Sequence, residues 1–154
     1  MINSTHCYIE KDGKWLMLCR NKKKNDINKN KWIGVGGRFE DGESPEECII
    51  REIKEETGLT VYKPKFKGIV TFCDDGYCEY MHLFTATEFS GEITDCNEGE
   101  LRWIDIKDVP GLELWEGDRY FIDLILDNAP FFSLKLVYEN HTLGSVILNG
   151  EVVK

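Results

Sequence analysis

The sequence of 154 residues lacks the features of secreted and membrane proteins. No apolar run approaches the length needed to span a bilayer. The first five residues contain no basic segment followed by an apolar stretch, which a secretory signal peptide requires. The six cysteines, at positions 7, 19, 48, 73, 78 and 96, show no C-x-x-C or zinc-ligand spacing. We therefore expect a cytoplasmic protein with reduced cysteines and no membrane partner.

Positive charge is scarce, with 19 Lys and Arg residues against 28 Asp and Glu residues and a net charge of −9. Such an acidic surface repels a phosphate backbone, which argues against a nucleic acid polymer as a partner. A small substrate with several phosphates is still compatible with this charge if metal ions supply positive charge locally.

The chain also lacks repeats, low-complexity segments and linkers, and 42% of its residues are hydrophobic. We therefore expect a single packed domain over residues 1–154, as a monomer or weak homodimer. Strands and helices are expected in mixed order, which predicts the α/β class, an α/β/α sandwich with a mixed sheet. The expected strands are 6–10, 14–19, 67–72, 77–89 and 100–106, the helices are 45–57 and 118–126, and a closing hairpin joins 131–139 to 145–153 around a turn at 140–144.

The helix expected at 45–57 has clear end signals. Ser44 is its expected N-cap and Glu47 completes a capping box, while Gly58 is the expected C-cap. Glu52, Glu55 and Glu56 then lie within roughly a 100° arc of one helix face. The three glutamates form either a solvated acidic face or a site for a divalent cation such as Mg²⁺ or Mn²⁺, which favours clustered oxygen ligands.

The surrounding pattern favours the cation site. Residues 37–59 match Gly-x5-Glu-x7-Arg-Glu-U-x-Glu-Glu-x-Gly-U without a gap, where U is the aliphatic Ile53 or Leu59. Seven fixed identities recur by chance on the order of once in 10⁸ starts. The segment resembles the Nudix signature, and the chain is similar to Nudix hydrolases, which split a nucleoside diphosphate linked to another group. The resemblance implies the same sandwich fold.

The resemblance also implies the site residues. Glu52, Glu55 and Glu56 would bind the metal ions together with the Gly37 carbonyl oxygen. Arg51 would orient this cluster by pairing with Glu43 or Glu55. Glu52 is the first choice as general base and Glu56 the second.

A further acid from a later loop often joins such a site, and Glu98 is the best candidate here, with Glu100 second. The alternative for Glu98 is an ordinary polar loop residue. Without metal, mutual repulsion is expected to raise the pKa values of the acidic group.

Outside the signature at residues 37–59, the chain resembles the mutator-type branch that hydrolyses oxidised purine nucleoside triphosphates. In that branch, an aromatic side chain stacks on the base and a nearby acid recognises the edge of the purine. The resemblance implies that Trp115 and Asp118 have these two roles here. The alternatives are core filling for Trp115 and helix capping for Asp118. The animal enzymes have an asparagine in place of Ile33 and an acid in place of Gly117, so this chain lacks two groups that could hydrogen-bond the base. The segments that carry the resemblance are 20–23, 31–37, 95–99, 115–118 and 130–133.

The loop at 21–30 leads into this region and contains Lys23 between two further lysines. It is either solvated surface or a contact for the substrate's phosphates, and Lys23 is the candidate for that contact. The implied reaction converts 8-oxo-dGTP to a nucleoside monophosphate and pyrophosphate, which would sanitise the nucleotide pool. The competing interpretations are a Nudix enzyme of broader nucleotide specificity and a Nudix module that binds nucleotides without catalysis. The signature at residues 37–59 keeps all of its glutamates, which favours catalysis.

Overall fold

The computed structural model describes residues 1–22, 24–26 and 28–154. Its helical elements are α1 (Pro45–Thr57), the 3₁₀ helix η1 (Ile106–Gly111) and α2 (Asp118–Leu126). Its strands are β1 (Ile2–Lys11), β2 (Lys14–Cys19), β3 (Trp32–Ile33), β4 (Thr60–Tyr62), β5 (Lys65–Asp74), β6 (Tyr77–Ala86), β7 (Glu88–Ser90), β8 (Glu100–Asp105), β9 (Phe132–Glu139), β10 (Thr142–Leu148) and β11 (Glu151–Val152).

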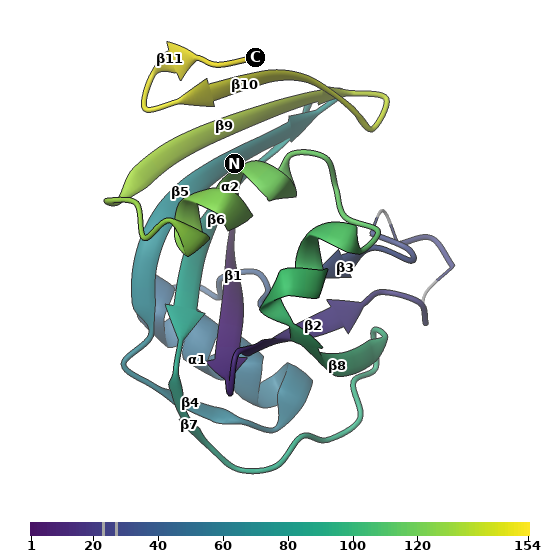
Figure 1. Ribbon diagram of the computed structural model, residues 1–154, viewed down its shortest axis with the longest axis vertical. Coiled ribbons are helices and arrows are strands. Elements are labelled where there is room, and N and C mark those ends of the chain that lie inside the picture. Colours follow the sequence, from purple (N-terminus) through teal and green to yellow (C-terminus); the bar gives the residue numbers. More distant parts are fainter. Residues whose placement is uncertain (23, 27) are drawn as a thin grey trace.

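The main sheet is mixed, as the sequence predicts. Its strand order is β11-β10-β9-β5-β6-β1-β2-β3, and β8 pairs with β2. The β1–β6 and β5–β9 pairs are parallel, whereas the neighbouring hairpins are antiparallel. The long strands β5, β6 and β9 curve past the N-terminal strand β1 (Figure 1). The α/β sandwich is therefore confirmed.

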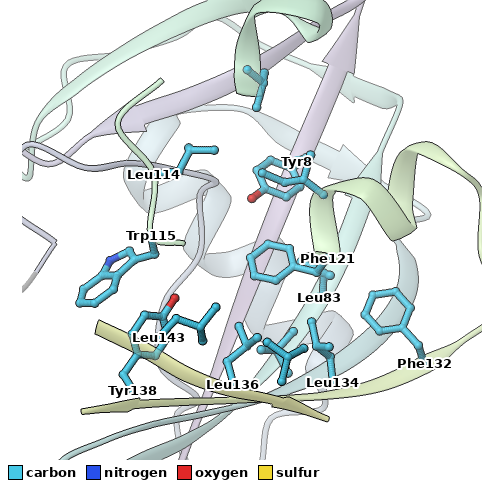
Figure 2. Close-up of a cluster of buried hydrophobic side chains, with 14 of the residues drawn as sticks. Tyr8, Leu83, Leu114, Trp115, Phe121, Phe132, Leu134, Leu136, Tyr138 and Leu143 are labelled. Atoms are coloured by element: carbon cyan, nitrogen blue, oxygen red, sulfur yellow. The ribbon is translucent and has the colours of Figure 1, made fainter. Parts of the chain in front are cut away.

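The sheet separates two hydrophobic cores. Along β2, Trp15 and Met17 belong to the core that includes Phe121 of α2, while Leu16 and Leu18 belong to the core that includes Ile53 of α1. Successive side chains of a strand point to opposite faces, so each helix covers one face. In Figure 1, α2 lies in front of the strands and α1 behind them. Figure 2 shows the α2-side core, where Phe121 lies between Tyr8 and the leucines of β9.

The predicted ends of α1 are confirmed. The Ser44 hydroxyl accepts a hydrogen bond from the Glu47 N–H at 3.1 Å, and the Glu47 carboxylate accepts one from the Ser44 N–H at 2.9 Å. Gly58 ends the helix with a φ of 83°, a left-handed conformation that glycine adopts without steric cost. These local contacts fix where α1 begins and ends, and therefore where its glutamates lie.

Several predicted strand boundaries are wrong; β1, for example, begins at Ile2 and not at residue 6. The strand expected at 77–89 is divided at Thr87 into β6 and β7, which belong to different sheets. The closing turn is shorter than the 140–144 predicted, and β10 begins at Thr142. Asn140 and His141 both have positive φ values, 50° and 64°, and such a two-residue turn joins antiparallel strands directly. A register shift in β10 between Leu143 and Ser145 accommodates Gly144.

The cysteines differ in part from expectation. Cys73 and Cys78 are direct cross-strand partners in the β5–β6 hairpin, with Cα atoms 4.2 Å apart, and a disulfide joins them. The expectation of reduced cysteines is therefore wrong for this pair, because the register of the hairpin places the two residues opposite each other. Cys7, Cys48 and Cys96 are buried free thiols. None of the helices among the described residues is long and apolar enough to cross a membrane.

Candidate active site

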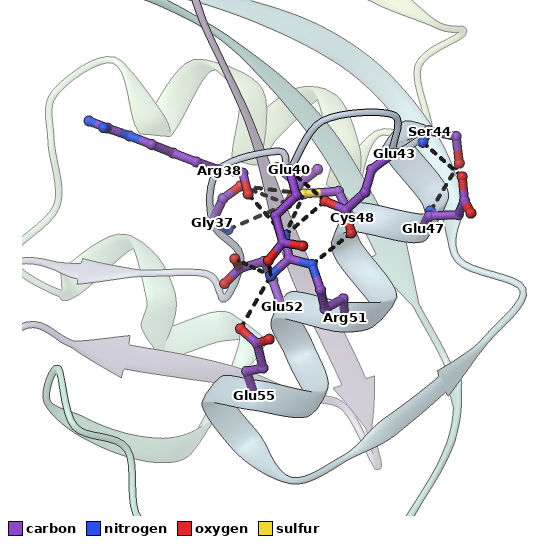
Figure 3. A network of polar contacts seen from close by, with 11 residues as sticks. Gly37, Arg38, Glu40, Glu43, Ser44, Glu47, Cys48, Arg51, Glu52 and Glu55 are labelled. Atoms are coloured by element: carbon purple, nitrogen blue, oxygen red, sulfur yellow. Dashed lines mark hydrogen bonds and ion pairs between the residues drawn. The ribbon is translucent and has the colours of Figure 1, made fainter.

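Arg51 stands at the centre of a dense polar network on α1 (Figure 3). Its guanidinium forms a two-pronged pair with Glu43, with Nε–Oε2 and Nη2–Oε1 distances of 2.6 and 2.9 Å. Its Nη1 donates to Glu52 at 2.8 Å and to Glu55 at 3.2 Å. A further bond at 3.0 Å reaches the Arg38 carbonyl oxygen in the loop before the helix. Both pairings expected for Arg51 are thus present at once, and they tie the loop to the helix.

Glycines at the loop allow the carboxylates to approach the backbone. A Cβ atom on Gly37 would lie 2.3 Å from the Glu52 Oε2 atom, so only glycine leaves room for this carboxylate. A Cβ on Gly36 would lie 2.1 Å from the Thr5 carbonyl oxygen of β1. The Gly36 N–H donates a hydrogen bond of 3.1 Å to the Glu56 carboxylate. Gly36 and Gly37 therefore pack closely on β1 and let the Glu52 and Glu56 carboxylates approach the loop backbone.

Glu56 is the most strongly perturbed acid of the group. Burial raises the pKa of its carboxyl to about 8, and the nearby charges of Glu98 and Glu52 add to the increase. Burial also raises the pKa of Glu52, with smaller contributions from Glu55 and Glu98. The predicted increase is present, but desolvation, and not mutual repulsion, is its largest cause. The sequence places these charges on one face, but it does not show how deeply they lie.

The two later acids lie in different surroundings. Glu98 forms an ion pair with Arg20 at 3.3 Å and lies close enough to raise the pKa of Glu56. Glu100 is on β8 and pairs with Arg102 at 2.5 Å. Of the two candidates, the structure therefore brings Glu98, and not Glu100, to the glutamates of α1.

The chemistry of these residues fits a divalent cation. Glu52, Glu56 and Glu98 form a partly buried acidic group, and Arg20 compensates the charge only in part. A hard cation would remove this conflict. In their present positions, no three His, Cys, Asp or Glu side chains among the described residues converge as a metal-binding group. The Gly37 carbonyl oxygen accepts hydrogen bonds from the Thr5 N–H at 2.7 Å and hydroxyl at 3.1 Å, so it is already engaged.

A cavity of about 560 Å³ opens beside these acids. Its lining includes Gly36, Gly37 and Glu56 beside the acidic group and also Trp115 and Asp118, which are far from them in sequence. This volume lies within the range of small-molecule sites. Much of the lining is apolar and comes from strands and from α2; it includes Ile33, Val70, Phe72, Met81, Phe121 and Leu136.

Trp115 both fills the core and lines the cavity. Only 6% of the residue is exposed, and its ring packs edge to face against Phe72. The same ring packs edge to face against Tyr138 (Figure 2). The Lys31 ammonium lies 5.6 Å from the ring centroid. The indole N–H donates to the Asn28 Oδ1 atom at 2.7 Å. The two interpretations of Trp115 are therefore compatible, since the ring is held rigidly in the cavity wall.

Asp118 is the first residue of α2, but it does not cap the helix. The N-cap position is Gly117, and no side-chain hydrogen bond caps the helix there. Asp118 instead lines the cavity, and burial raises the pKa of its carboxyl to about 7, against the opposing charges of Lys31 and Arg119. This acid is therefore a cavity group that can be neutral or charged near neutral pH.

Replacing Asp118 by asparagine is expected to stabilise the protein at pH 8 by about 2–4 kcal/mol. Because folding raises the pKa of this carboxyl from 3.8 to about 7, the folded state is favoured below pH 4 and loses this advantage as the pH rises to 7. Asparagine cannot ionise, so the variant does not lose this free energy of unfolding as the pH rises. Urea unfolding at pH 8 and at pH 5 would measure the free energy of unfolding, and the gain should shrink at pH 5.

The matched control is Asp123→Asn on the exposed face of the same helix. Its effect on the free energy of unfolding should be small and similar at both pH values. A gain for Asp118→Asn that does not change between pH 5 and pH 8 would show that ionisation of this carboxyl is not the cause.

The structure explains the two positions that differ from the animal enzymes. Ile33 lines the cavity with an apolar side chain. A Cβ atom on Gly117 would lie 2.6 Å from the Leu136 Cδ1 atom and 2.7 Å from the Tyr138 hydroxyl, so a larger residue there would require these two side chains to shift. The Gly117 N–H donates to the same Tyr138 hydroxyl at 2.7 Å. Glu55 is 59% exposed and lies at the edge of the site, while Lys23 lies outside the described residues.

Sequence reasoning assigned no function to two further cavity residues. Arg20 follows directly after β2, and its Nε atom donates to Asp26 at 2.6 Å. The signal for Arg20 is its place at the end of a strand, where the chain enters a basic, polar loop. His6 lies within β1, and its Nε2 atom accepts the Gly34 N–H at 3.1 Å. Burial lowers the pKa of His6 to about 4, so the ring is neutral at neutral pH. Sequence patterns gave no signal for it.

Comparison with known proteins agrees with this geometry. Residues 3–125 match the NUDIX domain family. An uncharacterised Nudix hydrolase, YvcI of Bacillus subtilis, is 32% identical over 128 residues, which is 79% of this chain and 77% of that protein. The oxidized purine nucleoside triphosphate hydrolase of Danio rerio is 34% identical over 111 residues, 71% of each chain.

A solved structure extends the likeness to nearly the whole chain. The mutator MutT protein from Bacillus halodurans superposes with a TM-score of 0.86 at 30% identity, and the match covers 98% of this chain and 99% of that one. Nudix hydrolases act on small nucleotides and generally use divalent metal ions such as Mg²⁺. With the capped glutamate helix, the Arg51 network and the adjoining cavity, these matches show that the chain belongs to the Nudix hydrolase family.

Proposed function

We propose that this protein hydrolyses oxidised purine nucleoside triphosphates, 8-oxo-dGTP among them, to the nucleoside monophosphate and pyrophosphate in the presence of Mg²⁺. One observation carries the proposal. A single cavity is lined by Glu56 and also by Trp115 and Asp118. A nucleotide in it would place its phosphates beside the acids of α1 and its base beside the indole ring.

Residues 1–154 would act together as one domain. The matched family segment ends at residue 125, but β9 pairs with β5 in the same sheet, and Leu136 of β9 lines the cavity. The C-terminal hairpin therefore contributes to the base end of the proposed site.

The acids would hold Mg²⁺ and activate the attacking water. Glu52, Glu55, Glu56 and Glu98 supply the oxygen ligands, joined by the Gly37 carbonyl if its bond to the Thr5 hydroxyl opens. Bound Mg²⁺ would stabilise negative charge that develops on the phosphate oxygens. Glu56 lines the cavity, whereas the Glu52 carboxylate is turned toward Arg51, so the geometry supports Glu56 over Glu52 as the general base.

At the base end, the residues would bind and orient the nucleotide. The Trp115 ring offers an aromatic surface that is fixed by Asn28, Phe72 and Tyr138. The Asp118 carboxyl can donate or accept a hydrogen bond, because burial raises its pKa to about 7. Arg20, held by Asp26 and Glu98, also lines the cavity and would contact the phosphates.

A second candidate is a Nudix pyrophosphatase of broader nucleotide specificity. The observation that favours it is the apolar Ile33 side chain in the cavity, together with Gly117, which has no side chain to hydrogen-bond a base. A site that stacks on a base without hydrogen bonds discriminates weakly between bases.

The test is Mg²⁺-dependent turnover of 8-oxo-dGTP against dGTP at matched low concentrations, with the products identified by mass. We expect a strong preference for the oxidised nucleotide, monophosphate and pyrophosphate as products, and loss of turnover when a chelator removes Mg²⁺. Similar rates for the two nucleotides would favour the broader pyrophosphatase. Nucleotide binding without turnover would contradict both and indicate a binding module.

A further inference from the structure

The side chain of Asn28 is oriented by the indole of Trp115. Asn28 lies in the polar loop between β2 and β3 and lines the same cavity as Trp115 and Asp118. Its Oδ1 atom accepts the Trp115 Nε1–H at 2.7 Å. Because an indole nitrogen can only donate, the oxygen of this amide must face it. The Asn28 Nδ2 group is then the part of the side chain left for another partner.

The backbone of Asn28 is also held in place. Its N–H donates to the Asp26 Oδ1 atom at 2.9 Å, and its carbonyl oxygen accepts the Lys31 N–H at 2.8 Å. The other oxygen of Asp26 accepts the Arg20 Nε–H at 2.6 Å. The amide is therefore fixed at both its backbone and its side chain before any ligand binds, and such preorganisation favours affinity.

Among the residues that the structure describes, none accepts a hydrogen bond from Asn28 Nδ2. The lining of the same cavity also includes Asp118 and the apolar side chains of Ile33, Phe72 and Met81. A ligand that excludes water from Asn28 would leave the amide donor unsatisfied unless the ligand brings an acceptor. The acceptor that a planar base presents most prominently is a ring carbonyl oxygen.

We infer that Asn28 is a specificity-determining residue whose Nδ2 group donates to a carbonyl oxygen of an oxopurine base. The inference rests on the proposed function for the identity of the ligand as a purine nucleotide. Asn28 then supplies an amide in the cavity that Ile33 cannot supply. An aminopurine without a ring carbonyl lacks the matching acceptor, so the site should favour guanine-type and 8-oxo bases over adenine.

The test replaces Asn28 by aspartate. This variant keeps an oxygen for the Trp115 N–H and has nearly the same shape, but an acceptor replaces the free donor. The control is Asn30→Asp, which adds the same charge to the exposed end of the same loop; Asn30 has a φ of 64°, which aspartate tolerates. Thermal unfolding of both variants shows whether the fold is retained.

Binding is measured by calorimetry with 8-oxo-dGMP, dGMP and dAMP, without metal. For Asn28→Asp we expect about tenfold or greater weakening for 8-oxo-dGMP and dGMP, and much less for dAMP, whose amino group suits a carboxylate. Asn30→Asp should bind all three like the wild type. Equal weakening for the three nucleotides, or no weakening, would overturn the inference.

The same experiment separates this inference from the proposed function. If the wild type hydrolyses 8-oxo-dGTP but Asn28→Asp does not alter base preference, the inference is wrong and the proposed function stands. If the wild type hydrolyses neither triphosphate but its monophosphate binding depends on Asn28 as expected, the proposed function is wrong and the inference holds. Failure of the wild type to bind any of the three would overturn the inference as well.

Discussion

Replacing Glu56 by glutamine is expected to lower the Mg²⁺-dependent turnover of 8-oxo-dGTP by roughly 10²–10⁴-fold. Glu56 is the one glutamate of the proposed metal group that lines the cavity, and its carboxylate also accepts the Gly36 N–H. Glutamine keeps an acceptor for that bond but removes the charge and the basic oxygen. The measurement is kcat with saturating Mg²⁺, together with the increase in melting temperature that Mg²⁺ produces, which should also be lost.

The control for this variant is Glu46→Gln, the same exchange at an exposed position in the first turn of α1. It should keep the turnover and the Mg²⁺-induced stabilisation of the wild type. Glu56→Gln without added Mg²⁺ should be at least as stable as the wild type, because it removes a buried carboxyl group. A kcat within a few-fold of the wild type would rule out Glu56 as both metal ligand and base.

The helix that carries this site could be predicted from the sequence because its determinants are local. The capping box at Ser44 and Glu47 and the left-handed Gly58 involve contacts over only a few residues. Amphipathic spacing and the acidic motif then place the three glutamates without any knowledge of the sheet. The same holds for the β1–β2 and β5–β6 hairpins, whose turns lie between neighbouring strands.

The parts that were wrong or missed depend on distant contacts. The boundary at Thr87 exists because β7 leaves β6 to pair with β4, a partner more than 25 residues away in sequence. The bond of His6 to Gly34 and the ion pair of Arg20 with Glu98 likewise join segments that only the fold brings together. No period or spacing in the sequence encodes these pairs.

The electrostatics of the site show the same limit. The sequence predicts that like charges share one face of α1, and hence that their pKa values rise. Burial turns out to be the larger cause for both Glu56 and Glu52. The depth of these carboxylates follows from how closely Gly36 and Gly37 approach β1 and Glu52, which is a property of the packed structure. Gly117 is a similar case, because the side chains that leave little room for a larger residue at this position, Leu136 and Tyr138, come from the distant strand β9.

Replacing Arg51 by alanine should lower both stability and activity, although Arg51 does not line the cavity. The variant loses the two-pronged bond to Glu43, the bonds to Glu52 and Glu55 and the bond to the Arg38 carbonyl oxygen. We expect roughly 2 kcal/mol less free energy of unfolding, from charge-assisted hydrogen bonds that connect the loop to the helix. Mg²⁺ affinity should fall about 10–100-fold, since Arg51 orients the Glu52 carboxylate.

Two further variants separate orientation from charge. Arg51→Lys keeps the positive charge but not the planar fork that matches the Glu43 carboxylate, so it should recover only part of the lost Mg²⁺ affinity. Lys54→Ala removes an exposed positive charge from the same helix and should change Mg²⁺ affinity little. The guanidinium also holds the pKa of Glu43 down at about 2, so the wild type should keep the stabilising pair until the pH falls toward 2. If Arg51→Lys matches the wild type in Mg²⁺ affinity, Arg51 acts only through its charge, and the geometric argument for the network fails.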